Sequence, residues 1–268
     1  MTLTLSTCWY QVQSKFNPVI YHLWMKNLIS NAVNFNLVIY TNYESSQILK
    51  KYYGKKNIKI IIRKFEEFST YKYENYWVSN HHKNTLLQNT DHRLNMIWSE
   101  KINFVLESYK NHYFDSDFYG WCDIGYFRNR ECDLRLENLN PWPSESKLKR
   151  LNPDLIYYGI ANNKISDLQN IFKLINNKNT NNLPTIPPPV EQISIAGGFF
   201  ISHHKNLEWW QKIYFSTLIN YLTNNVLVKD DQIILADCIF SNLEHFNLIY
   251  ENDPQYDNWF LFQRFLSS

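Results

Sequence analysis

The first 62 residues alternate between segments typical of strands and segments typical of helices, and this order constrains the fold more than any other feature. Strand-like segments occupy 2–10, 35–40 and 58–62, and helix-like segments occupy 19–32 and 45–53. The first helix is expected to begin near Pro18, after an asparagine, and the second to end before Gly54. Alternation at this spacing predicts parallel strands joined by right-handed crossovers. We therefore expect an α/β fold with a central, mostly parallel sheet and a Rossmann-like, nucleotide-binding N-terminal half.

The rest of the chain continues the alternation and is predicted to complete the same sheet. Strand-like segments at 155–160 and 193–202 alternate with helix-like segments at 167–175, 207–222 and 233–238. Residues 176–192 are rich in asparagine and contain three consecutive prolines. A loop of this length inside a domain is either disordered or a functional lid. We predict a single domain over 1–268, with a flexible loop around 176–191.

Composition and charge exclude several classes of protein. The net charge of +2 is far from the basic excess of a dedicated nucleic-acid binder, so no nucleic-acid partner is expected. The four cysteines form no C-x-x-C pair, which favours reduced thiols over a disulfide frame or a zinc site. No apolar run reaches the roughly 18 residues of a membrane span, and the first residues are too polar for a signal peptide. These features predict a cytoplasmic protein without a membrane span.

One carboxylate stands where a ligand-binding residue of an α/β sheet is expected. The aromatic, apolar run that begins at Phe118 is typical of a buried strand, and it is followed by Asp123 and then Gly125. In open α/β sheets, ligands bind at the carboxyl ends of the strands. Asp-x-Gly is also a common turn string, so the pattern alone leaves open that Asp123 only starts a turn.

Three other groups of residues are candidates for the same site. Gly197 and Gly198 weaken a strand-like run, which is expected where another group approaches the backbone closely. Asp230 and Asp231 precede a predicted helix, where acidic residues also serve as N-caps. A helix is predicted from Asp91 through Leu106, and its cations Arg93 and Lys101 are eight residues apart, although such side chains are usually solvated.

Three short strings, taken in chain order, resemble GT-A-fold glycosyltransferases, and most closely the HtrL/YibB-like family. They are the W-x-D-x-G of residues 121–125, the G-G-x-F of residues 197–200 with a later tryptophan, and the acidic pair 230–231 that opens a helix. A helix that ends in Lys101, and an aromatic tail after the acidic segment 253–257, also fit. The resemblance covers about residues 2–265. It implies one GT-A-like domain, with a donor half at 1–130 and an acceptor half at 131–268.

The resemblance implies transfer of a sugar from a nucleotide-diphosphate sugar, UDP-sugar favoured, to a hydroxyl group of a glycan, protein or other acceptor. Such a reaction needs a cradle for the nucleoside, positive charge near the departing diphosphate and a group that handles the acceptor proton. Asp231 is the expected base if the reaction inverts the configuration of the sugar. If the configuration is retained, Gln232 or a backbone-assisted front-face route is expected instead. The remaining expected roles are nucleoside binding by Thr7, Tyr40 and Thr41, diphosphate binding by Arg93 and Lys101, donor binding by Asp123 and Gly125, sugar or acceptor contact by Gly197 and Gly198, and acid–base support by Asp230.

The need for a metal ion is left open by the sequence. GT-A enzymes typically carry D-x-D, whose second carboxylate helps to bind Mn²⁺ or Mg²⁺, but Gly125 takes that place here. A hard divalent cation prefers several oxygen ligands. Asp123 is therefore a candidate metal ligand that needs help from Asp231 or His245. The alternative function is a non-catalytic nucleotide- or carbohydrate-binding protein that retains the fold.

Overall fold

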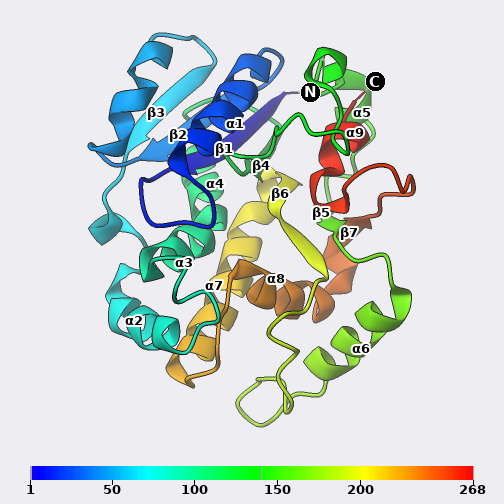
Figure 1. The fold of residues 1–268 in the computed structure, drawn as a ribbon. Coiled ribbons are helices and arrows are strands. Elements are labelled where there is room, and N and C mark those ends of the chain that lie inside the picture. Colours follow the sequence, from blue (N-terminus) through cyan, green and yellow to red (C-terminus); the bar gives the residue numbers. More distant parts are fainter. Residues whose placement is uncertain (1, 140, 268) are drawn as a thin grey trace.

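A computed structural model describes residues 2–139 and 141–267, and within them one seven-stranded sheet runs through the molecule (Figure 1). The strands are β1 (Leu3–Trp9), β2 (Asn36–Thr41), β3 (Ile58–Ile62), β4 (Phe118–Cys122), β5 (Ile156–Ile160), β6 (Ile195–His203) and β7 (Phe246–Ile249). Their order is β3-β2-β1-β4-β6-β5-β7. β6 runs antiparallel to β4 and β5, and all other neighbours are parallel. The predicted α/β fold with a central, mostly parallel sheet is confirmed, and the GT-A likeness stays a prediction.

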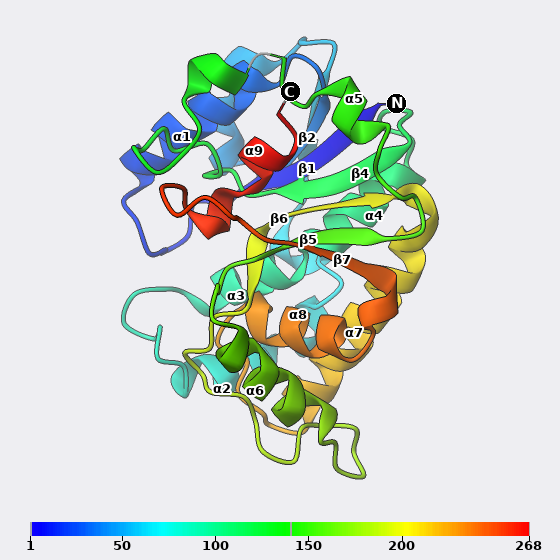
Figure 2. The same ribbon diagram turned by 90° about the vertical axis from the view of Figure 1, so that its right-hand side faces the viewer.

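Helices cover both faces of the sheet, as Figure 2 shows. One face carries α1 (Pro18–Asn31), α5 (Glu145–Leu148) and α9 (Phe262–Phe265). The other carries α2 (Glu74–His82), α3 (His92–Ser99), α4 (Lys101–Lys110), α6 (Ile165–Asn176), α7 (Leu207–Thr223) and α8 (Asp231–Phe240). Each layer encloses its own buried apolar cluster, because side chains of successive strand residues point to opposite faces. Phe199 packs under α9, for example, while Phe200 faces the α7 layer.

3₁₀ helices connect many of these elements. They lie at Ser45–Tyr52, Phe65–Glu67, Tyr71–Tyr73, Leu136–Leu139, His204–Asn206, Leu243–His245 and Asn258–Phe260. In the part of the chain that the structure describes, no helix is both long and apolar enough to cross a membrane.

The single helix predicted from Asp91 to Leu106 is wrong, because two helices meet at Glu100. The Glu100 side chain is fully buried and accepts hydrogen bonds from the Ser69 hydroxyl and from the backbone N–H and hydroxyl of Thr70. These bonds hold the residue between α3 and α4. As a result, Lys101 is the first residue of α4 and does not end a helix as the resemblance implied.

The two glycines of β6 form a bulge opposite β5. Tyr158 pairs with Phe200, but the next residue of β5, Gly159, pairs with Ala196. Residues 197–199 of β6 therefore have no partner in the β5 ladder. A bulge of this kind releases backbone groups from the sheet and bends the strand locally.

The loop predicted to be flexible is held to the helical layer by several hydrogen bonds. Lys178 and Pro184 form an isolated bridge, and the Lys178 ammonium pairs with Asp237 of α8. The Asn220 side chain of α7 donates to the carbonyl of Asn181. Mobility of residues 176–191 stays a prediction.

Glu100→Ala should lower the free energy of unfolding by about 1–3 kcal/mol, because the Thr70 N–H and two hydroxyls lose a buried acceptor. Chemical denaturation followed by circular dichroism measures the change. Glu66→Ala is the matched control, since Glu66 is exposed in the neighbouring turn and its replacement should cost less than about 0.5 kcal/mol. Equal effects of the two substitutions would contradict the role given to Glu100.

Candidate active site

A cleft of about 440 Å³ opens at the carboxyl edge of the sheet, beside the ends of β1 and β4. β2 and β4 lie on opposite sides of β1 in the sheet. This edge is therefore the topological switch point, where α/β folds bind ligands. Because β6 is antiparallel, its first residues lie at the same edge. The walls come from residues 8–18, the junction of α3 and α4, residues 121–130, the β6 bulge, the start of α8 and residues 257–260.

The ammonium group of Lys101 lies at the back of the cleft among three oxygens. Its Nζ is 2.9 Å from Asp231 Oδ2 and 3.1 Å from Asp123 Oδ1, and it donates a 2.9 Å hydrogen bond to the carbonyl of Gly197. The Lys101 side chain is only 8% exposed. Burial alone would lower the pKa of Lys101, but Asp123 and Asp231 raise it above its ordinary value, so the group stays charged.

The β6 bulge is shaped to admit Asp231. A Cβ atom at Gly197 would lie 3.0 Å from Asp231 Oδ2, closer than a side chain there could fit without displacing the carboxylate. A Cβ atom at Gly198 would be 3.4 Å from Asp123 Oδ2, an ordinary contact. The close approach predicted for the glycine pair therefore occurs at Gly197, and the approaching group is a carboxylate of the protein.

Asp123 both begins a turn and faces the cleft. Its backbone N–H donates to Gly198 O at 2.8 Å, and its carbonyl accepts from Tyr126 N at 2.9 Å. Its Oδ1 accepts a 2.6 Å hydrogen bond from the Trp121 indole N–H. The side chain is 42% exposed, which leaves it accessible to a ligand in the cleft.

The acidic pair has two different environments. Asp230 is the N-cap of α8, where its Oδ1 accepts from Gln232 N at 3.2 Å, as the alternative interpretation predicted. Asp231 is the first residue of α8 and is buried against Lys101. Burial raises the pKa of Asp231 to about 6, against the opposing effect of Lys101. Burial also raises the pKa of Asp230. Asp231 therefore lines the cleft with a raised pKa, and Gln232 lines the cleft beside it.

Three cations that the sequence interpretation missed line the cleft: Lys15, Arg128 and Arg130. Arg128 donates from Nε to Gly125 O at 3.0 Å, and its guanidinium carbon is 4.2 Å from the ring centre of Trp24. Lys15 is exposed, and its Nζ is 5.1 Å from the ring centre of Trp98. Arg128 follows Asp123 by five positions, and that proximity to a strand end was the available signal.

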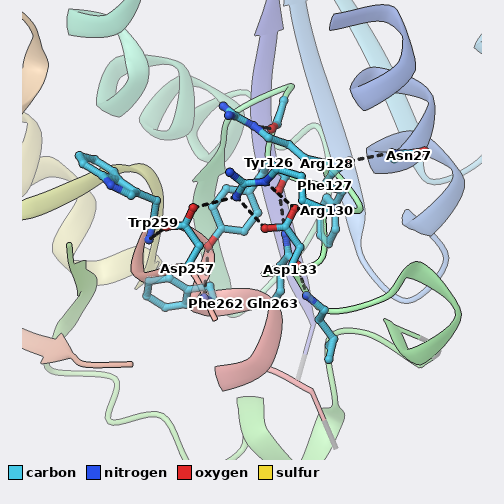
Figure 3. Close-up of polar contacts among 12 residues, drawn as sticks. Asn27, Tyr126, Phe127, Arg128, Arg130, Asp133, Asp257, Trp259, Phe262 and Gln263 are labelled. Carbon is cyan, nitrogen blue, oxygen red and sulfur yellow. Dashed lines mark hydrogen bonds and ion pairs between the residues drawn. The ribbon is translucent and has the colours of Figure 1, made fainter. Parts of the chain in front are cut away.

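The C-terminal segment closes one side of the cleft and is tied to the loop after β4 (Figure 3). Arg130 binds Asp133 at 2.7 Å and Asp257 at 2.8 Å. The Gln263 side chain donates to the carbonyl of Tyr126 at 2.8 Å, and the Tyr126 hydroxyl accepts from a backbone N–H of α9. These bonds join segments that are far apart in sequence into one wall.

Four predicted donor-binding residues lie outside the cleft. Thr7 is fully buried within β1. The Tyr40 hydroxyl donates to a backbone carbonyl of α4, and the Thr41 hydroxyl donates to a carbonyl of β1 at 2.6 Å. Arg93 is exposed, and its guanidinium donates two hydrogen bonds to Asp91. The structure thus brings together Lys101, Asp123, Gly125, the glycine pair and residues 230–232, but not these four.

The residues present do not fit a bound Mn²⁺ or Mg²⁺. Among residues 2–139 and 141–267, no group of three or more His, Cys, Asp and Glu side chains could share a metal ion. Both carboxylates that could contribute are paired with Lys101. A Cβ atom at Gly125 would lie 2.8 Å from the Trp24 ring, so no second carboxylate fits there without rearrangement. His245 packs against Trp209 with tilted rings and does not line the cleft.

Comparisons with known proteins give a distant likeness of fold. No family model matches the chain, and no curated protein sequence matches it. Among solved structures, it is similar to the apo form of mouse xyloside xylosyltransferase 1, with a TM-score of 0.48 and 10% sequence identity. That alignment covers 93% of this chain and 85% of the mouse chain. The resemblance to the HtrL/YibB-like family stays a prediction.

The stability of the protein should depend on pH through Asp231. Its pKa is higher in the folded state than the ordinary 3.8, so the folded state holds the proton more tightly and the free energy of unfolding falls as pH rises from about 4 to 7. A difference of about two pKa units corresponds to about 3 kcal/mol. Asp231→Asn lacks this titration. Urea denaturation gives the free energy of unfolding of the wild type and of Asp231→Asn. The wild-type value minus the variant value should fall by up to about 3 kcal/mol as pH rises from about 4 to 7. A difference in the free energy of unfolding that stays constant or increases with pH would contradict the prediction.

Proposed function

We propose that this chain transfers a sugar from a nucleotide-diphosphate sugar, UDP-sugar favoured, to a hydroxyl group of a glycan or protein acceptor. The observation that carries the proposal is the convergence of an accessible carboxylate, a buried carboxylate–lysine pair and a cationic guanidinium at the switch point of the sheet. Each is a group that glycosyl transfer requires.

The donor is held on the N-terminal side of the cleft in this proposal. Trp98 and the loop after β1 line the cleft and offer aromatic and apolar surface to a nucleobase. Asp123 accepts hydrogen bonds from hydroxyls of the ribose or the sugar. Arg128 and Lys15 neutralise the diphosphate, because guanidinium and ammonium groups bind phosphate oxygens strongly. Residues 1–130 thus supply the donor half, and 131–268 the acceptor half.

Asp231 handles the acceptor proton. A new bond forms between the acceptor oxygen and the anomeric carbon of the sugar, while the bond from that carbon to the phosphate oxygen breaks. The acceptor hydroxyl gives its proton to Asp231, and the nucleoside diphosphate leaves with the bonding electrons. A pKa of about 6 keeps Asp231 ionised at neutral pH and basic enough to take part. Lys101 positions the carboxylate, and Arg128 stabilises the charge that develops on the leaving group.

Calorimetric titration with UDP, GDP, CDP and ADP, followed by their sugar conjugates, tests the proposal. At least one nucleoside diphosphate should bind, and its sugar conjugate should be transferred or slowly hydrolysed. If none of the nucleotides binds, the proposal is wrong. Binding without any turnover, unaffected by Asp231→Asn, would favour the non-catalytic alternative that retains the fold.

Arg128→Gln should weaken binding of the nucleoside diphosphate by about tenfold or more, since a charged hydrogen bond contributes about 1.5–3 kcal/mol. Arg93→Gln is the matched control, because Arg93 is exposed and paired with Asp91 outside the cleft. Its nucleotide affinity should equal that of the wild type in the same calorimetric assay. A larger loss for Arg93→Gln than for Arg128→Gln would reverse the assignment.

A further inference from the structure

We propose that the ammonium group of Lys101 stands where a divalent cation would otherwise bind, so that nucleotide binding in this cleft needs no metal ion. The statement about nucleotide rests on the proposed function. The statement about the cation does not, because it concerns only the groups around Lys101.

Three protein oxygens lie between 2.9 and 3.1 Å from the ammonium nitrogen of Lys101. The Gly197 carbonyl in the β6 bulge accepts a hydrogen bond, and the carboxylates of Asp123 at the end of β4 and Asp231 at the start of α8 form ion pairs. Trp121 contributes a fourth contact, because its ring centre is 5.8 Å from Nζ. A charge held on this many sides is a permanent part of the site.

The same arrangement leaves a divalent cation with few free ligands. Asp123 Oδ1 already accepts from the Trp121 indole as well as facing Lys101. Asp231 is 6% exposed and has its oxygens packed against Gly197. A cation that used either carboxylate would lie within a few ångströms of the ammonium group and be repelled by it. It would also lack the six or more oxygens that hard cations prefer.

Positive charge for the diphosphate is available elsewhere in the cleft. Arg128 and Lys15 line it without taking part in the Lys101 cluster. Arg130 also lines the cleft, but its charge is engaged by Asp133 and Asp257. The tasks that one metal ion could perform are thus divided among side chains. Lys101 holds the two carboxylates in place, Arg128 and Lys15 bind the phosphates, and Asp123 contacts the donor.

The wild-type protein provides the first test. Titration with MnCl₂, followed by the electron paramagnetic resonance signal of free Mn²⁺, should show no binding at concentrations up to about 1 mM. The affinity for UDP, measured by calorimetry in EDTA and again with about 1 mM MnCl₂, should differ by less than about twofold. Binding of Mn²⁺ with a micromolar dissociation constant, or UDP binding that is about tenfold tighter with Mn²⁺, would overturn the inference.

Removal of the ammonium group provides the second test. Lys101→Ala leaves Asp123, Asp231 and the Gly197 carbonyl around a vacated position, so this variant should gain Mn²⁺ binding and a Mn²⁺-dependent rise in Tm that the wild type lacks. The control Lys101→Ala/Asp123→Asn removes one carboxylate and should lose that response. A folded Lys101→Ala variant that shows no response to Mn²⁺ counts against the inference.

The two tests separate the possible failures. If Lys101→Ala does not fold, the Mn²⁺ and UDP titrations of the wild-type protein decide the inference by themselves. If UDP and the other nucleotides do not bind under any condition, the proposed function fails, and the Mn²⁺ titrations still decide whether Lys101 occupies the cation position.

Discussion

The burial of one ammonium group is the constraint on which the site depends. Removing a charge from water is costly unless it is paired and hydrogen-bonded. Lys101 meets this requirement with three oxygens from three different elements. The break at Glu100 sets Lys101 at the start of α4, and the β6 bulge turns a carbonyl toward it. The break at Glu100 and the bulge in β6 thus position the two partners of one contact, the Lys101 ammonium and the Gly197 carbonyl.

The cleft combines a rigid back with a composite front. At the back, Asp123, Lys101 and Asp231 fix one another and leave only Asp123 substantially exposed. At the front, the loop after β4 and the C-terminal segment are joined through Arg130 and Tyr126 (Figure 3). A ligand therefore meets preorganised charges in a cavity whose shape depends on tertiary contacts. Preorganised charge of this kind contributes to catalysis because it needs no reorganisation as the reaction proceeds.

Much of the fold was predictable, because the alternation of strand and helix patterns along the chain indicates parallel strands joined by crossover helices. The glycine pair also carried a usable signal, since two glycines in a strand are unfavourable without a close approach. The interior positions of Thr7 and Tyr40 were not predictable. Strand periodicity indicates that a side chain is on one face or the other, but not whether a ligand or a helix covers it. The choice between Arg93 and Arg128 likewise depends on long-range packing that no local pattern encodes.

The separation of the Lys101 partners along the chain has a consequence for how the protein assembles. Lys101 and Gly197 are 96 residues apart, and Asp231 is farther still. Chains are synthesised from the N-terminus. A long loop must close, at an entropic cost, before contacts between distant residues can stabilise the fold. During synthesis, β1, β2, β3 and β4 can pair while Lys101 is still hydrated. Its ammonium group loses that water only when β6 and α8 arrive, so the cleft is completed after the sheet that supports it.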